Sequence, residues 1–227
     1  MKYYKAFLAS SINEFRHERR EIGDFIRVLN NVSMRHGAYI YLTICENVSN
    51  SLAQKQKQSE YDQMIRDSRF CYFLFGRHAG AYTRWELQVA QTQFQASGAP
   101  KIRVYFAPLP EGETADEDAQ ALQQQLREAG VDCRTFAHLD CIKLDILLDL
   151  AENPEIRDVL RTDHDTVSLF GQRVLSLENA RRHCGEEGLR KRFQQRGWEG
   201  LFDSAPLPME ACDGSPSPSA EELGGPV

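Results

Sequence analysis

The sequence has no long hydrophobic run. No window approaches the roughly 18 consecutive apolar residues that a membrane-spanning helix needs. The first residues, Met1–Lys5, lead directly into a strand pattern, without the apolar region and small-residue cleavage site of a secretory signal. With 41% hydrophobic and 26% charged residues, the 227-residue chain has the composition of a soluble globular protein. We therefore expect a cytoplasmic protein with no membrane partner.

Most of the chain also has no excess of positive or of negative charge. The formal net charge is −6, from 27 basic and 33 acidic residues. Residues 203–227 hold five of those acids and no Lys or Arg, so the rest has 27 basic and 28 acidic residues. A nearly neutral body gives no electrostatic reason to expect nucleic acid as a partner. The segment 203–227 is rich in Pro, Ser, Gly and acids, which predicts a disordered acidic tail.

Cysteine pairs with metal-ligand spacing are absent. The chain has six cysteines but no CxxC pair, and several lie in apolar runs, where buried reduced thiols are expected. Cys184 beside His183 is the only adjacent pair of a histidine and a cysteine, whereas a closed zinc site needs about four ligands. We therefore predict neither a disulfide framework nor a metal site.

Several familiar catalytic and phosphate-binding motifs are missing too. The sequence contains no Walker-type loop, no GxGxxG after its first apolar run and no GxSxG. The places where a response regulator would carry its acids hold Ser10–Ser11 and Gly76–Arg77 instead. These absences argue against the standard nucleotide cradles, a phospho-accepting aspartate and an acyl-transfer serine.

Short apolar runs that alternate with helical patterns are present throughout the first two thirds of the chain. This alternation predicts an α/β fold with a parallel sheet and crossover helices. The predicted strands are residues 3–9, 38–45, 70–75, 102–107 and 132–137.

The helical patterns lie between these strands. Ser11–Glu14 resembles a capping box before a helix whose inner face holds Phe15, Ile22, Phe25, Ile26 and Leu29. Further helices are predicted over 55–67, 83–96 (inner face Leu87, Ala90 and Phe94), 115–129 and 141–151. Beyond residue 151 we expect a C-terminal appendage, residues 152–202, with a hairpin at 166–177 around Gly171 and a charged helix at 178–196.

Ligands of open parallel sheets bind at the carboxyl ends of the strands, so the residues after each run are the candidates. These are Ser10–Ser11, Glu46–Asn47, Gly76–Glu86 and Pro108–Pro110. The third segment combines two glycines with Tyr82, Trp85 and Glu86. Aromatic faces beside a carboxylate suit a ligand with a flat base and a sugar.

Three segments resemble a Toll/interleukin receptor (TIR) domain, especially the TIR-like domains of prokaryotic proteins. They are Phe7–Ser11, Phe70–Phe75 and Tyr82–Leu87, and the likeness covers about residues 3–150. The resemblance implies a flavodoxin-like, doubly wound parallel sheet of about five strands over residues 1–151. It also implies that Glu86 is the glutamate that cleaves nicotinamide from NAD⁺, which is a substrate and not a cofactor.

The resemblance implies further roles around Glu86. The loop Glu46–Lys55 would gate substrate access and mediate self-association. From their place at the carboxyl ends of the strands, we predict that substrate is bound by Ser10, Ser11, Glu46, Asn47, Tyr82 and Trp85. One departure concerns register, because Trp85 directly precedes Glu86 and does not lie a few residues earlier. This departure leaves the alignment of Glu86 with the family's catalytic glutamate undetermined by about one helical turn.

The chemistry needs few groups. Breaking the ribose–nicotinamide bond develops positive charge on the sugar, which a fixed carboxylate stabilises. The pyridine leaves as a neutral molecule, so no acid has to protonate it.

Simpler roles stay open for the same residues. Thr83–Glu86 fits a capping box, in which Glu86 would bond the backbone of the cap residue. Ser11 is either a helix cap or a phosphate contact, and Arg16–Arg20 is either a solvated helix face or a phosphate contact.

The predicted function is NAD⁺ hydrolysis or cyclisation in bacterial defence or signalling. One alternative is a non-catalytic TIR-like interaction module. Another is a nucleoside deoxyribosyltransferase-like enzyme, which also places a glutamate near a sugar.

Overall fold

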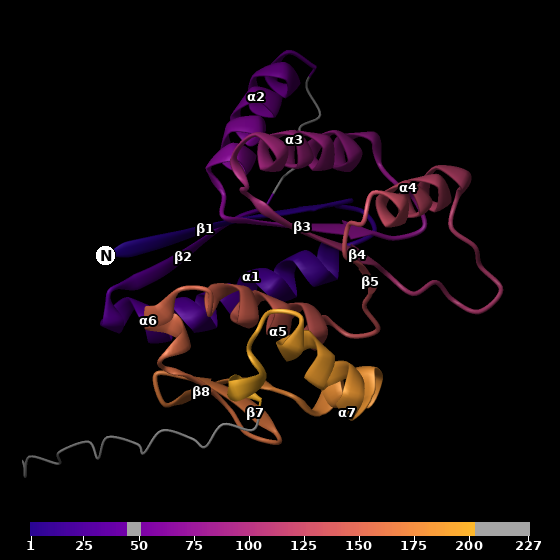
Figure 1. The fold of residues 1–227 in the computed structure, drawn as a ribbon. Coiled ribbons are helices and arrows are strands. Elements are labelled where there is room, and N and C mark those ends of the chain that lie inside the picture. The colour runs from indigo at the N-terminus through magenta and orange to yellow at the C-terminus, as the bar shows by residue number, and fades with distance from the viewer. Residues whose placement is uncertain (45–50, 203–227) are drawn as a thin grey trace, which may run out of the picture.

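A computed structural model of the chain describes residues 1–44 and 51–202. Its centre is a five-stranded parallel sheet with the order β2-β1-β3-β4-β5 (Figure 1). The strands are β1 (Lys2–Ser10), β2 (Ala38–Ile44), β3 (Phe70–Phe75), β4 (Lys101–Phe106) and β5 (Cys133–Thr135). This order is that of flavodoxin-like folds, so the predicted fold class is confirmed.

Helices cover both faces of the sheet (Figure 1). One face carries α2 (Ser51–Asp67), α3 (Ala81–Ser97) and α4 (Glu117–Glu128), and the other carries α1 (Arg16–Ser33) and α5 (Leu139–Leu150). All six residues of β3 are buried, because alternate side chains enter the apolar layer on each face. The five predicted strands and their helices are confirmed, with shifted boundaries.

A C-terminal region follows α5. It contains α6 (Pro154–Arg157), β6 (Leu160–Thr162), β7 (Thr166–Leu169), β8 (Gln172–Ser176) and α7 (Glu178–Gln194), and short 3₁₀ helices lie at Met34–His36 and Glu199–Leu201. The predicted hairpin is confirmed, and Phe170 and Gly171 both have positive φ at its turn. The antiparallel strand β6, which pairs with β7, was not predicted.

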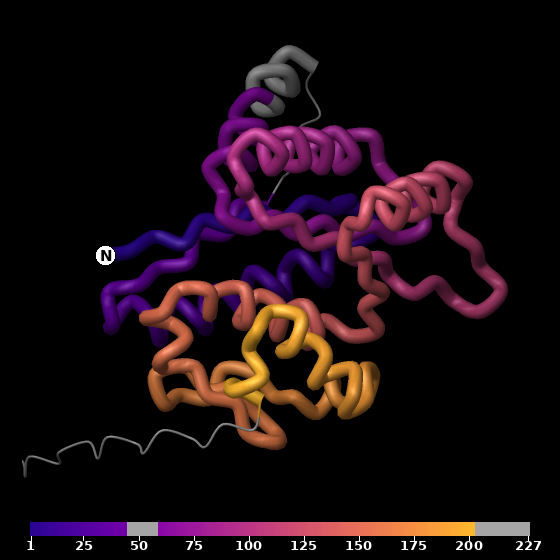
Figure 2. The backbone as a smooth tube through the Cα atoms, viewed as in Figure 1, coloured from indigo at the N-terminus to yellow at the C-terminus, as the bar shows by residue number. Residues whose placement is uncertain are grey.

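The C-terminal region packs against the outer side of α1 and α5 (Figure 2). Leu175, Leu189 and Phe193 belong to the same buried cluster as the inner residues of α1 and α5. Residues 152–202 therefore complete the core on this side of the sheet, while their division from residues 1–151 stays a prediction. No helix of residues 1–44 or 51–202 is long and apolar enough to cross a membrane.

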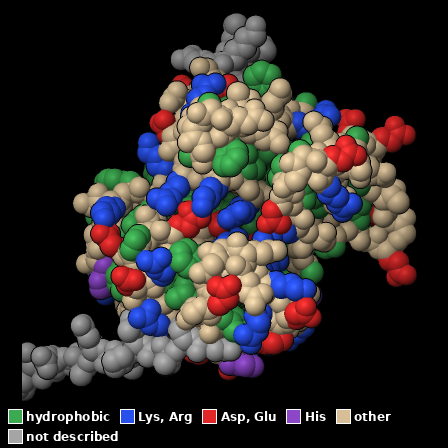
Figure 3. Space-filling view, viewed as in Figure 1, with side chains coloured by type: hydrophobic (Ala, Val, Ile, Leu, Met, Phe, Trp, Pro, Cys, Tyr) green, Lys and Arg blue, Asp and Glu red, His purple; other side chains and the backbone are tan. Residues whose placement is uncertain are grey.

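Surface charges of both signs are interspersed. On the face in Figure 3, Lys and Arg side chains form a band across the middle, with acidic side chains beside them. This mixture agrees with the near-neutral composition of the body of the chain.

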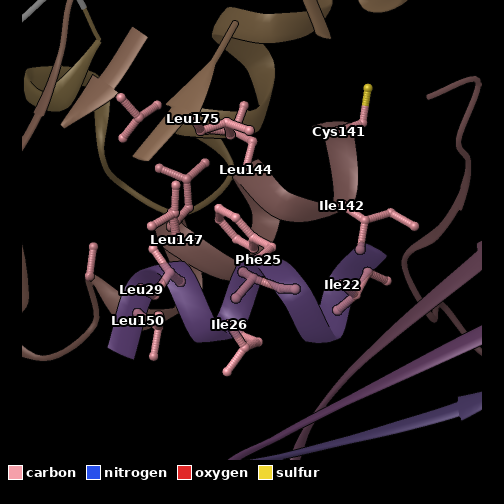
Figure 4. Close-up of a cluster of buried hydrophobic side chains, with 14 of the residues drawn as sticks. Ile22, Phe25, Ile26, Leu29, Cys141, Ile142, Leu144, Leu147, Leu150 and Leu175 are labelled. Atoms are coloured by element: carbon pink, nitrogen blue, oxygen red, sulfur yellow. The ribbon is translucent and has the colours of Figure 1, made fainter. Parts of the chain in front are cut away.

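The layer between α1 and α5 is formed by aliphatic side chains and one phenylalanine (Figure 4). Ile22, Ile26 and Leu29 of α1 repeat at helical spacing and belong to the same buried cluster as Leu147 and Leu150 of α5. The predicted inner face of α1 is therefore confirmed. The helix begins at Arg16, after a turn in which the Glu14 N–H donates to Ser11 Oγ at 3.4 Å.

The inner face of α3 differs from the prediction. Leu87 and Ala90 are buried, but Phe94 is 46% exposed. Thr83 and Glu86 occupy the buried stripe instead. A polar residue at an inward position interrupts the apolar pattern from which the face was predicted.

Candidate functional site

The strand order places a switch point at β1. The chain passes from β1 to β2 on one side, and β3 lies on the other side of β1, so a crevice is expected at the carboxyl ends of β1 and β3. Ser10 ends β1, and the loop that begins with Gly76 follows β3. The sequence prediction had selected both places.

Glu14 joins the two loops at this edge. Its Oε1 accepts from the backbone N–H groups of Arg77 at 3.1 Å and His78 at 3.4 Å. Gly76 permits this approach, because a Cβ at that position would lie 3.0 Å from Glu14 Oε1 and 3.2 Å from the Phe15 ring. This role of Glu14 was not predicted from the sequence, in which Glu14 fits a capping box with Ser11.

Ser10 and Arg19 form a buried polar pair beneath the same edge. Arg19 Nη1 donates to the Ser10 carbonyl at 3.2 Å. The Ser10 hydroxyl is buried and has no hydrogen-bond partner among the described residues. A buried hydroxyl without a partner is costly, so a polar ligand group at this place would stabilise it. Ser11 is only half-buried and serves the turn before α1.

Glu86 lies in the second turn of α3 and is only 4% exposed. The N-cap of α3 is Gly80, and Thr83 is already inside the helix, so the capping box predicted at Thr83–Glu86 is wrong. Burial raises the pKa of the Cys71 thiol in β3, and the negative charge of Glu86 raises it further. Glu86 lies on the side of α3 that packs on the sheet, and it makes an interaction of its own.

Tyr82 and Trp85 are each 50% exposed. Trp85 Nε1 donates to Asp62 Oδ1 of α2 at 3.3 Å, which fixes the indole against the neighbouring helix. Tyr82 lies one turn before Glu86 on α3, at the i, i+4 spacing that brings side chains together. Both aromatic side chains are accessible at the end of α3 nearest the switch point.

A polar depression of about 730 Å³ adjoins the loop after β3. Arg77 forms ion pairs with Glu113 at 3.4 Å and Asp116 at 3.5 Å, and the His78 ring also contacts Asp116. Asp116 is the residue that directly precedes α4, within the range 115–129 that was predicted as a helix. These acidic side chains, Glu113 and Asp116, were not predicted from the sequence to lie beside the loop after β3.

Two predicted site residues cannot be placed, because Glu46 and Asn47 lie outside the described residues. Within residues 1–44 and 51–202, no three or more His, Cys, Asp or Glu side chains form a group that could hold a metal ion. The four cysteines described there, Cys71, Cys133, Cys141 and Cys184, are free thiols.

Comparison with known proteins gives little further information. No protein-family model matches the chain, and no curated protein matches it. A solved structure of the RPS4 and RRS1 TIR domain heterodimer is similar with 13% identity and a TM-score of 0.38, over 66% of this chain and 97% of that chain. At this low TM-score, the fold class rests on the strand order.

Proposed function

We propose that the protein cleaves the ribose–nicotinamide bond of NAD⁺, as a hydrolase or a cyclase, with Glu86 as the carboxylate that stabilises the sugar cation. The observation that carries the proposal is the burial of Glu86, which is 4% exposed in the second turn of α3, the helix that follows the loop after β3. Glutamate is rarely buried without a specific partner or function. The TIR-like segments around β1, β3 and α3 support the same assignment.

The neighbouring polar groups suit the rest of the substrate. The Arg19 guanidinium and the Ser10 hydroxyl, both buried at the end of β1, match the charge and hydrogen-bonding needs of a diphosphate. Tyr82 and Trp85 offer exposed aromatic faces for a base. In a site with little water, a fixed carboxylate stabilises an oxocarbenium-like transition state more strongly than in bulk solvent.

Burial also sets a requirement for catalysis. Reacting groups must approach to about 3–3.5 Å, so Glu86 has to exchange its present surroundings for the ribose when NAD⁺ binds. Self-association, which the TIR resemblance implies, is one source of the energy for this rearrangement. We therefore expect activity to rise with protein concentration.

The experiment incubates concentrated protein with NAD⁺ and measures nicotinamide release by chromatography. Glu86→Gln keeps the shape of the side chain and removes its charge, and we expect its rate to fall by at least about 100-fold. Glu128→Gln, at an exposed site on α4, is the matched control and should leave the rate unchanged. Absence of nicotinamide in every assembly state, or equal rates for Glu86→Gln and the parent protein, would refute the proposal.

A non-catalytic interaction module is the second candidate. The exposure of Tyr82 and Trp85 favours it, because large accessible aromatic side chains are common at protein interfaces. This function predicts self-association that Trp85→Ala weakens, no NAD⁺ turnover, and no effect of Glu86→Gln on assembly. Sedimentation of the three proteins, run beside the nicotinamide assay, separates the two functions.

A further inference from the structure

Two cysteines from separate helices meet where α5 and α7 pack together. Cys141 of α5 and Cys184 of α7 have their Sγ atoms 3.1 Å apart, in a thiol–thiol hydrogen bond. Cys141 is buried, and Cys184 is half-buried. Figure 4 shows the sulfur of Cys141 directed away from α1. The pair therefore combines one half-buried cysteine with one buried cysteine.

The surroundings give the two thiols different acidities. The hydrogen bond from Cys141 lowers the pKa of Cys184, burial opposes this, and the positive charge of Arg192 lowers it further. The same hydrogen bond and burial raise the pKa of Cys141. Arg192 is held in place by an ion pair with Asp145. Both directions make Cys184 the more acidic thiol of the pair.

The backbone of α7 changes direction directly beside Cys184. Gly185 has φ 67° and ψ 169°, which interrupts α7 directly after Cys184. No atom lies within 4 Å of the position that a Cβ would take at Gly185, so the space beside this residue is not filled by other parts of the protein. A disulfide bond is about 2.05 Å long, so the sulfurs need to move together by only about 1 Å.

We propose that Cys141 and Cys184 form an oxidation site whose substrate is a hydroperoxide. The Cys184 thiolate attacks the outer peroxide oxygen, the O–O bond breaks, and the alcohol leaves after taking a proton from solvent. The resulting sulfenic acid on Cys184 is then attacked by the sulfur of Cys141. Water leaves with the proton of Cys141, and the two sulfurs have lost two electrons to the peroxide.

Cys133 serves as an internal comparison for the reactivity of Cys184. It is partly buried like Cys184, but burial, together with the charge of Asp132, raises its pKa to about 11. No thiol partner is described for it. Partial exposure alone would predict similar reactivity for Cys133 and Cys184. Because a thiolate reacts and a neutral thiol does not, the pairing of Cys184 with Cys141 predicts that Cys184 reacts much faster.

The first experiment treats the full-length reduced protein with one equivalent of hydrogen peroxide and maps its peptides by mass spectrometry. We expect a Cys141–Cys184 cross-link with a mass loss of about 2 Da, reversed by dithiothreitol. In Cys141→Ser the resolving thiol is missing, so a dimedone adduct of the sulfenic acid should accumulate on Cys184. In Cys184→Ser neither the cross-link nor an adduct on Cys141 should form.

The second experiment needs no variant. Iodoacetamide labelling of the reduced parent protein at pH 7 should modify Cys184 at least about tenfold faster than Cys133. Cys45 and Cys212 lie outside the described residues, and peptide mapping separates them from this pair. The proposal is overturned if Cys184 labels no faster than Cys133, or if peroxide leaves Cys141 and Cys184 both reduced.

Discussion

Asp145 and Asp149 of α5 have no exposed side-chain surface. Asp145 accepts from the Tyr105 hydroxyl at 2.9 Å and pairs with Arg134, Arg192 and Arg196. Several charged partners are needed, because a carboxylate loses most of its hydration when it is buried.

Asp149 is surrounded in a similar way. It accepts from the Tyr72 hydroxyl at 3.1 Å, from Arg103 Nη2 at 2.7 Å and from Arg196 Nε at 2.9 Å. Because Arg196 contacts both aspartates, the two sites form one network. This network connects β3, β4 and β5 with α5 and α7.

Removing Asp149 should leave these cationic partners buried without their counter-charge. We expect Asp149→Ala to lower the free energy of unfolding by about 3–5 kcal/mol, measured by urea denaturation. Asp118→Ala is the control, because Asp118 pairs with Arg84 at 3.4 Å on the surface and should contribute less than about 1 kcal/mol. Equal losses for the two variants would show that the buried network adds no stability.

At the scale of the elements, the turn between β1 and α1 is positioned by the loop after β3. Glu14 bonds the backbone of Arg77 and His78, and the absence of a side chain at Gly76 allows the two segments to meet. The contact joins the two loops that leave the paired strands β1 and β3 at the switch point. Adding even a small side chain at Gly76 should therefore displace the loops that follow the carboxyl ends of β1 and β3.

Gly76→Ala tests this contact. The added Cβ would lie 3.0 Å from Glu14 Oε1 and 3.2 Å from Phe15, so the loops must separate. We expect a loss of about 1–3 kcal/mol of unfolding free energy in chemical denaturation. Gly200→Ala should change stability by less than about 0.5 kcal/mol, because nothing lies within 4 Å of its Cβ position. A neutral Gly76→Ala would mean that the Glu14 contact adjusts without cost.

At the scale of the whole molecule, the aspartate network links the sheet to the C-terminal region, so its titration should affect global stability. Burial alone would raise the pKa of Asp145, but the charges of Arg196, Arg192 and Arg134 outweigh this and lower it. In the unfolded chain an aspartate has a pKa of about 3.9. The folded state therefore binds fewer protons from Asp145 than the unfolded state does.

This difference fixes the direction of the pH dependence. The stabilisation by Asp145 is complete above about pH 4 and is lost as the pH falls toward the lowered pKa of the folded state. We expect the free energy of unfolding to decline below about pH 4, and to decline less steeply in Asp145→Asn. Urea titrations between about pH 2.5 and 7 measure both slopes, and parallel slopes would assign the acid sensitivity to other carboxyl groups.

The sequence by itself determined the fold class and the carboxyl-edge candidates. Continuous apolar runs and helical periodicity are local signals, and they located β3 at Phe70–Phe75 and most of α1 and α5. Because parallel strands present their carboxyl ends at one edge, Ser10 and the segment after β3 could be selected without coordinates. The three-residue strand β6 was too short to leave such a pattern.

Only the tertiary structure decided which side chains meet. Glu14 lies 63 residues from Arg77, and Cys141 lies 43 residues from Cys184, so no local pattern connects either pair. The burial of Glu86 and the exposure of Phe94 depend on how α3 is rotated against the sheet. These contacts arise from the stacking of layers, because packing between elements depends on shape and rotation that sequence periodicity does not specify.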